Sequence, residues 1–171
     1  MASSTLAESR LDIERLIRLL RDSDSATKTL SAWVGSPITL RMMRRENDHL
    51  TGAEFADLDL WSPEPVQRRE VFLRDAGGRV LSEATAVVVL GRLPRDEVTA
   101  LCETDVPLGL VLSRLAVRRH TLKVIRRALA AGQEAEVLFE VTARMDVGGV
   151  PVALVRERYL DGVLHVVAEH S

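Results

Sequence analysis

The segment EVLFEVTARMDVGGVPVALVRERYL, residues 136–160, decides the fold class of this chain. In Glu136–Met145 apolar side chains alternate with polar or charged ones, as in a strand with one face on a core. Asp146-Val147-Gly148-Gly149 has the composition of a tight turn, and Val150–Leu160 continues as a second strand. The segment therefore predicts a long β-hairpin.

A second hairpin is predicted nearer the N-terminus. The strand that begins at Gln67 includes Arg68–Leu73, the turn is Asp75-Ala76-Gly77-Gly78, and the returning strand is Val80–Leu90. Alternation over Ile38–Met42 predicts one further strand before this hairpin.

Helices are predicted around these strands. Apolar residues between Leu6 and Leu20 fall mostly on one helical face, and Asp22-Ser23-Asp24-Ser25 ends that helix and caps a second one through Thr27–Val34. Pro94 favours a helix start, so Arg95–Glu103 is expected to be helical, with Cys102 as a buried residue of it.

Other segments give weaker signals. Residues 44–65 are polar, acidic and contain two prolines, which predicts a long loop that can include one helical turn, of the kind that often forms a lid. Leu110–Leu115 is a short apolar piece, and Val117–Leu129 fits either a strand or a short helix. Asp161-Gly162 can turn the chain into a last strand over Val163–Val167.

The predicted strands cluster without regular alternation of strands and helices. This pattern favours an α+β fold, an antiparallel β-sheet with helices packed on one side, over a doubly wound parallel sheet. The 171 residues are expected to form a single domain, 1–171.

Composition narrows the classes of partner. Lys and Arg number 23 against 25 Asp and Glu, so no overall field would attract nucleic acid, and few aromatic residues are available to stack on bases. Cys102 is the only cysteine, which excludes an intramolecular disulfide. With no signal peptide and no long apolar run, we expect a cytoplasmic protein with no membrane and no nucleic acid as partner.

Motifs for cofactor chemistry are absent from the sequence. There is no glycine-rich nucleotide-binding loop, and the glycine pairs fit hairpin turns better. His49, His120, His165 and His170 are scattered without metal-ligand spacing. The sequence therefore predicts no metal and no organic cofactor.

Four strings between about Leu16 and Leu160, taken in order, resemble the chorismate pyruvate-lyases. They are DSDSATKTL at 22–30, RREVFL at 68–73, DVPLG at 105–109 with Leu112, and PVALVRERYL at 151–160. Each string is weak alone, and the similarity rests on their joint order and spacing.

The resemblance implies a chorismate lyase-like fold that encloses an internal ligand pocket. It implies a cofactor-independent carbon–oxygen lyase that eliminates pyruvate from chorismate to leave 4-hydroxybenzoate, a biosynthetic reaction, with a small carboxylated molecule as substrate. Arg69 is similar to the arginine of the family that grips the ring carboxylate, and Glu157 to its acid. Ala26 and Leu108, followed by Gly109, match places where backbone N–H groups bind the carboxylate.

The chemistry suits these residue types. A guanidinium offers a planar fork to a carboxylate and stays charged when buried. A carboxyl shielded by apolar neighbours such as Val155 and Tyr159 can have a raised pKa and act as a general acid, the role expected of Glu157. The competing interpretation is that strand arginines are usually solvated or paired, and only one of Arg68 and Arg69 can point inward.

One departure from the family limits the assignment. Chorismate has two carboxylates, and the position where the family often has a second charged residue is Ala84 in this chain. Glu83 could supply the charge at this position only if the strand were shifted by one residue, and such a shift would turn its side chain to the other face of the sheet.

Two other functions therefore stay open beside the lyase. One is a diverged enzyme of secondary metabolism, an isomerase, cyclase or dehydratase acting on another carboxylated metabolite. The other is a non-catalytic small-ligand-binding domain, because related sheets serve as effector-binding domains in transcription regulators. About 20 to 30 residues precede the matched core, too few for a helix-turn-helix domain, so such a regulator is expected to need a partner chain.

Overall fold

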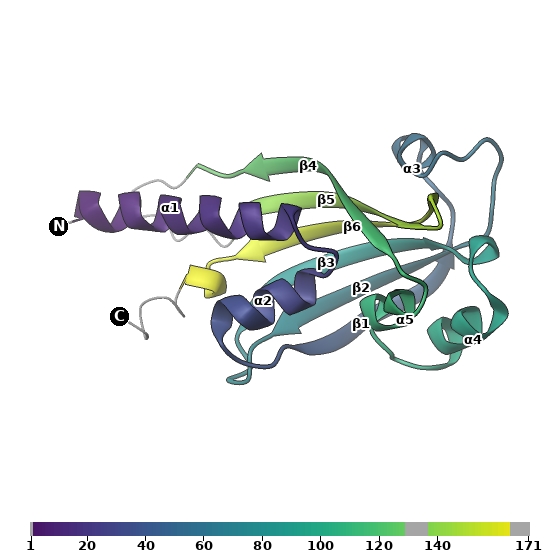
Figure 1. Ribbon diagram of the computed structural model, residues 1–171, viewed down its shortest axis with the longest axis horizontal. Coiled ribbons are helices and arrows are strands. Elements are labelled where there is room, and N and C mark those ends of the chain that lie inside the picture. The colour runs from purple at the N-terminus through teal and green to yellow at the C-terminus, as the bar shows by residue number, and fades with distance from the viewer. Residues whose placement is uncertain (1, 129–136, 165–171) are drawn as a thin grey trace.

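The computed structural model describes residues 2–128 and 137–164, with side chains from residue 7 onward. Six antiparallel strands form one sheet in the order β1-β2-β3-β6-β5-β4 (Figure 1). The strands are β1 Thr39–Asp48, β2 Val66–Arg74, β3 Val80–Val89, β4 Arg118–Arg126, β5 Val137–Val147 and β6 Val150–Leu160. The helices are α1 Ala2–Arg21, α2 Ala26–Val34, α3 Gly52–Asp57, α4 Arg95–Glu103 and α5 Leu108–Ser113, with a 3-10 turn η1 at Leu90–Arg92.

Both predicted hairpins are confirmed. β2 pairs with β3 and β5 pairs with β6, and β3 and β6 lie side by side at the centre of the sheet. The turn between β5 and β6 is shorter than predicted, because β5 continues to Val147 and only Gly148 and Gly149 connect the strands. Both glycines have positive φ, 58° and 80°, as a two-residue hairpin turn requires.

The two N-terminal helices are also confirmed, and local capping explains their boundaries. The side chain of Ser25, the N-cap of α2, accepts a hydrogen bond from the backbone N–H of Lys28, and Gly35 ends the helix in the left-handed conformation at φ 67°. The indole N–H of Trp33 donates to the carbonyl of Val163 at 2.9 Å, which ties α2 to the residues that follow β6.

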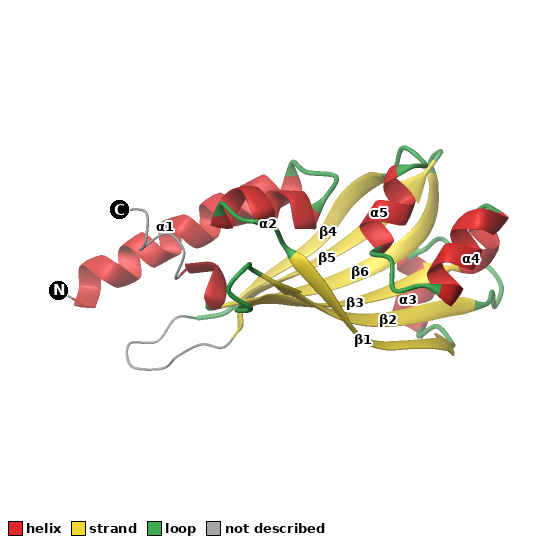
Figure 2. Cartoon of the chain, turned by 90° about the horizontal axis from the view of Figure 1, so that it is seen from below, coloured by secondary structure: helices red, strands yellow, loops and turns green. Residues whose placement is uncertain are grey.

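The prediction for residues 44–65 is wrong for 44–48, which are strand, while residues 49–65 form a connection with one short helix. β1 extends to Asp48, and a capping box between Thr51 and Glu54 starts α3. Glu54 then pairs with Arg68, which points away from the face covered by the other helices. This segment therefore packs on the opposite face of the sheet and does not cover the ligand pocket described below (Figure 2).

Three segments that the sequence left unsettled are now placed. Val117–Leu129 contains edge strand β4, which ends at Arg126, and the apolar piece at Leu110–Leu115 is most of helix α5 with the turn after it. Residues 162–164 are helical, contrary to the strand predicted over 163–167, and residues 165–167 lie outside the described part of the chain.

Buried side chains form two clusters on the helical face of the sheet. Toward one end, α1 and α2 pack Leu16, Leu20 and Leu30 against the sheet, where Phe139 and Tyr159 stack with ring centroids 4.6 Å apart. Toward the other end, α4 and α5 pack on β3, β5 and β6. A third cluster around Leu58 lies under the loop after α3 on the other face. The interval between the first two clusters contains the pocket.

Candidate functional site

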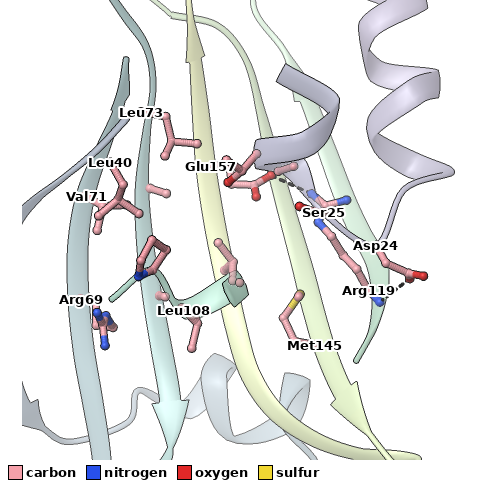
Figure 3. A pocket seen from close by; sticks show the side chains of 17 residues that line it. Asp24, Ser25, Leu40, Arg69, Val71, Leu73, Leu108, Arg119, Met145 and Glu157 are labelled. Carbon is pink, nitrogen blue, oxygen red and sulfur yellow. Dashed lines mark hydrogen bonds and ion pairs between the residues drawn. The ribbon is translucent and has the colours of Figure 1, made fainter. Parts of the chain in front are cut away.

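A pocket lies between the α1/α2 pair and the α4/α5 pair, on the helical face of the sheet (Figure 3). The cavity has a volume of about 100 Å³, which is enough for several waters or one small metabolite. Its walls come from all six strands and from the chain at the starts of α2 and α5. The lining residues are Asp24, Ser25, Ala26, Thr27, Leu40, Arg69, Val71, Leu73, Ala84, Ala86, Pro107, Leu108, Gly109, Arg119, Met145, Val155 and Glu157.

Small side chains on β3 create the space. Ala84 and Ala86 are neighbours on one face of the strand, where Ala84 pairs with Glu157 of β6 and Ala86 pairs with Val155. A larger side chain at either position would extend into the pocket. In the sequence, Ala84 occupies the position where the family often has a second charged residue. In the structure, it forms part of the pocket floor.

Arg69 is the charged side chain of β2 that lines this site, beside the apolar Val71 and Leu73 of the same strand. It is only 1% exposed, while its neighbour Arg68 points to the other face and pairs with Asp48 and Glu54. The expectation that only one of the two arginines faces inward is therefore confirmed. Glu83 also faces outward, where it pairs with Arg158 at 2.8 Å, so it does not replace the charge missing at Ala84.

Arg69 has no carboxylate partner within the described residues. Its guanidinium donates to the carbonyl oxygens of Leu101 (3.3 Å) and Val106 (2.8 Å) and to the side-chain oxygen of Gln67 (3.2 Å). These are neutral acceptors, although Leu101 belongs to the C-terminal turn of α4, the negative end of a helix. Burial lowers the pKa of Arg69, and the positive charge of Arg45 lowers it further, while Asp105 acts in the opposite direction.

Two N–H groups of Arg69, that of Nε and one of Nη2, are left for a ligand, because three of its five N–H groups are used by the hydrogen bonds within the described residues. Nε forms no hydrogen bond within the described residues, and the fully buried side-chain atoms without a partner there are Arg74 Nε and Ser82 Oγ, not Arg69 Nε. A buried cation with free donors and only neutral partners is a favourable place for an anionic group.

Glu157 is on the same face, on β6, but it has partners. Its Oε2 accepts hydrogen bonds from Arg119 at 2.7 Å and from the hydroxyl of Tyr159 at 2.8 Å, and all three side chains are buried. Burial, followed by the negative charge of Glu157, raises the pKa of Tyr159, so its hydroxyl stays a donor. The shielded, unpaired carboxyl expected of a general acid is therefore not found, because a buried arginine neutralises Glu157.

Sequence reasoning missed Arg119 as a pocket residue. It lies on β4, in the segment whose secondary structure was undecided, and its burial depends on the strand alternation that puts Arg118 outside and Arg119 inside. Asp24 and Ser25 also line the pocket, and they belong to a string already noted for its resemblance. The sequence signal that could have indicated Arg119 is the pair Arg118-Arg119 at the start of a segment with strand-like alternation, where one of two adjacent side chains must point inward.

The structure brings all five predicted site residues to one pocket. Arg69 and Glu157 come from its floor, Ala26 from the first turn of α2, and Leu108 and Gly109 from the first turn of α5. The first backbone N–H groups of a helix have no acceptor inside the helix, so these turns present donors at the pocket. Their part in ligand binding stays a prediction.

Two further sequence expectations concern reactive and metal-binding residues. Cys102 belongs to α4 as predicted, but it is exposed, because Leu101 is the residue of that turn that faces the core. In the described part of the chain, no group of three or more His, Cys, Asp or Glu residues is arranged to hold a metal ion.

Solved structures with the same fold come from transcriptional regulators. PhnF from Mycobacterium smegmatis matches with a TM-score of 0.62 and 16% identity, over 81% of this chain and 64% of PhnF, and its effector domain matches with 0.63 and 16%, over 81% and 89%. The ligand-binding domain of a GntR-family transcriptional regulator from Bordetella bronchiseptica matches with 0.55 and 17%, over 74% and 84%. No protein-family model and no curated protein matches the sequence.

The predicted fold class is confirmed. The chain has an α+β fold with an antiparallel sheet, and it shares the chorismate lyase-like architecture with the effector-binding domains of these regulators. This chain spans slightly less than two thirds of full-length PhnF. The likeness to chorismate pyruvate-lyases holds at the level of a related fold, and the comparisons identify no lyase.

The predicted lyase activity is wrong. The structural neighbours are ligand-binding domains of regulators, which overturns the assignment as an enzyme that releases pyruvate from chorismate, and with it 4-hydroxybenzoate biosynthesis and secondary metabolism. The pairing of Glu157 with Arg119 and Tyr159 agrees, because Glu157 is not the isolated acid that the lyase assignment expected. The sequence reading failed because a pocket with one arginine and one glutamate serves binding as well as catalysis.

The expected absence of a nucleic acid partner is also overturned. The neighbours belong to transcriptional regulators, which act on DNA, so a near-neutral overall charge of the domain did not exclude such a partner. Within residues 2–128 and 137–164, no helix is long and apolar enough to cross a membrane.

Proposed function

We propose that this chain is the effector-binding domain of a transcription regulator, and that its effector is a small molecule with an anionic group held by Arg69. The observation that carries the proposal is the buried guanidinium of Arg69, which lines a pocket and meets only neutral acceptors within the described residues. A ligand carboxylate or phosphate would supply the missing counter-charge.

The other side of the pocket favours a hydrogen-bond donor on the ligand. Oε2 of Glu157 accepts hydrogen bonds from Arg119 and Tyr159. Oε1 forms no hydrogen bond within the described residues, and it is not one of the fully buried atoms without a partner. Oε1 is therefore free to accept from a hydroxyl or amine. The effector class we infer has an anionic group at one end and a donor at the other, on a compact framework that fits beside Ala84 and Ala86.

Contact with DNA is part of the same proposal. The whole chain, residues 1–171, would act as one ligand-binding domain, and the DNA-binding unit would belong to another part of the polypeptide or to a partner chain. Such a regulator would work in the cytoplasm. The support for this is the shared fold with regulator effector domains.

Ligand binding is tested by thermal denaturation with inorganic phosphate, sulfate and small carboxylates as probes. A ligand at about 100 times its Kd stabilises the folded state by about 2.7 kcal/mol, which for a domain of this size raises Tm by about 5 °C or more. Arg69→Gln should abolish this increase. Arg41→Gln, an exposed arginine on β1, is the matched control and should keep it. An unchanged increase in Arg69→Gln would refute the proposed anion site.

The regulatory part is tested in the source cells. After crosslinking, DNA recovered with the protein should be enriched at discrete sites, and the enrichment should change when the effector is supplied. Absence of any site enrichment in cells that express the protein would contradict the assignment to a transcription regulator.

A further inference from the structure

Arg119 joins the pocket to the chain between α1 and α2. Its guanidinium donates to Oε2 of Glu157 at 2.7 Å and to the carbonyl oxygen of Leu20, in the last turn of α1, also at 2.7 Å. The side-chain oxygen of Thr121 accepts a third, longer bond at 3.4 Å. One buried side chain thus connects β6, which forms the pocket floor, with the end of α1.

The backbone of the same residue holds the next part of the chain. The N–H of Arg119 donates to Oδ1 of Asp24 at 3.1 Å, and Asp24 precedes Ser25, the N-cap of α2. Ser23 fixes this turn through hydrogen bonds with the backbone N–H and carbonyl of Ser25, both at 3.0 Å. Asp24 and Ser25 line the pocket, so the junction is itself part of the ligand site.

Arg119 also determines which oxygen of Glu157 is available. Because Arg119 and Tyr159 both bind Oε2, the carboxylate is held with Oε1 free. The charged groups that line the pocket around this carboxylate are Arg119 of β4, Asp24 of the α1–α2 turn and Arg69 of β2. Arg119 is the one in direct contact with it (Figure 3).

We propose that Arg119 is a positioning residue with two roles: it orients Glu157 so that Oε1 selects ligands with a hydroxyl or amine donor, and it transmits pocket occupancy to the α1–α2 junction. This inference rests on the proposed function, because it requires an anionic ligand at Arg69. It adds the residue that sets ligand selectivity and the segment of the fold that responds.

Selectivity is measured as a ratio of affinities. Inorganic phosphate probes the anion site, and glycerol phosphate adds hydroxyl donors to the same anion. In the unmodified protein we expect glycerol phosphate to bind about tenfold more tightly, the effect of one hydrogen bond to a charged acceptor. In Arg119→Met the ratio should fall to about one to threefold, while phosphate still binds.

Transmission is measured by hydrogen–deuterium exchange of the backbone amides of residues 20–29. Glycerol phosphate should slow exchange there in the unmodified protein and have little effect in Arg119→Met. Arg119→Lys keeps a cation but replaces the planar fork with a single ammonium, so we expect an intermediate ratio and weaker protection. Arg41→Met, an exposed arginine on β1 at the other edge of the sheet, should match the unmodified protein.

The outcomes separate this inference from the proposed function. A merely structural role for Arg119 would weaken both ligands equally and leave the ratio at about tenfold, which would overturn the inference while phosphate binding at Arg69 stands. A ratio near one in the unmodified protein would also overturn it. No phosphate binding at all, or binding unaffected by Arg69→Gln, would refute the proposed function and this inference together. If Arg119→Met does not fold, Arg119→Lys provides the test. An affinity ratio and a protection from hydrogen–deuterium exchange that both match the unmodified protein would then overturn the inference.

Discussion

The buried pair of Arg119 and Glu157 allows a sharp prediction about stability. At 2.7 Å and an effective dielectric constant of about 20, two unit charges attract by about 6 kcal/mol. Desolvation costs several kcal/mol for each ion, so the intact pair contributes little net stability. Removing Arg119 alone leaves Glu157 buried without a counter-charge, which typically costs about 3–5 kcal/mol.

We therefore expect Arg119→Met to lower the free energy of unfolding by about 3–5 kcal/mol and Tm by about 6–20 °C. Domains are usually stable by about 5–15 kcal/mol, so the variant should remain largely folded at room temperature. Glu157→Gln should also destabilise, because it leaves Arg119 unpaired. The double variant Arg119→Met/Glu157→Gln contains neither charge and should be more stable than either single variant.

Urea denaturation followed by circular dichroism measures these differences, with the slope of the transition checked for two-state behaviour. The Arg118→Met variant, on the exposed side of the same strand, should change stability by less than about 0.5 kcal/mol. If the losses in free energy of unfolding of the two single variants simply add in the double variant, Arg119 and Glu157 do not interact as the structure shows, and the prediction is refuted.

Three more predictions concern other parts of the fold. Ser82 is 1% exposed and its hydroxyl has no partner within the described residues, so Ser82→Ala should raise the free energy of unfolding by about 1 kcal/mol. Ser31→Ala is the control, because it removes a hydroxyl that donates a hydrogen bond at 2.8 Å and should lower the free energy of unfolding. Midpoints of urea denaturation measure both effects, and a loss of stability in Ser82→Ala would contradict the prediction. Burial alone would raise the pKa of Glu54, but hydrogen bonds from Arg68 and from backbone N–H outweigh it and hold the pKa below its ordinary value of 4.5. Stability from this carboxylate is therefore complete above that value and is lost as pH falls below it, so thermal scans at decreasing pH should show a smaller loss in Glu54→Gln. Ala84→Leu should fill the pocket, remove the increase in Tm caused by phosphate or carboxylate probes, and cost at most about 1–3 kcal/mol of stability in urea denaturation; a retained increase would place the ligand elsewhere.

Much of the fold could be predicted from local patterns. The 136–160 hairpin follows from period-two alternation and a glycine turn, and the start of α2 follows from Ser25 as an N-cap, because both signals act within a few residues. The same local patterns failed to predict the strand at 44–48, before the short helix α3. There, charged residues such as Glu46 and Asp48 belong to an edge strand that is open to solvent, and α3 is held by Glu54 and Arg68 across the other face.

The candidate site was only half visible in the sequence. Arg69 and Glu157 were singled out by resemblance to a family, and the structure does bring them into one pocket. Arg119 was missed because its relation to Glu157 spans 38 residues of sequence and depends on how β4, β5 and β6 align. The wrong enzymatic assignment has the same cause: whether a glutamate is a free acid or a paired carboxylate depends on a neighbour from another strand.

The sequence by itself determined the class of fold, since alternation, turns and helix caps are set by residues close together in the chain. The tertiary structure alone decided which charges meet. Arg68 and Arg69 are adjacent in the sequence, yet one pairs with two carboxylates on the outer face and the other lies among neutral groups in the pocket. A charge interacts through space with whatever the folded chain places within a few ångströms, and those partners come from distant segments.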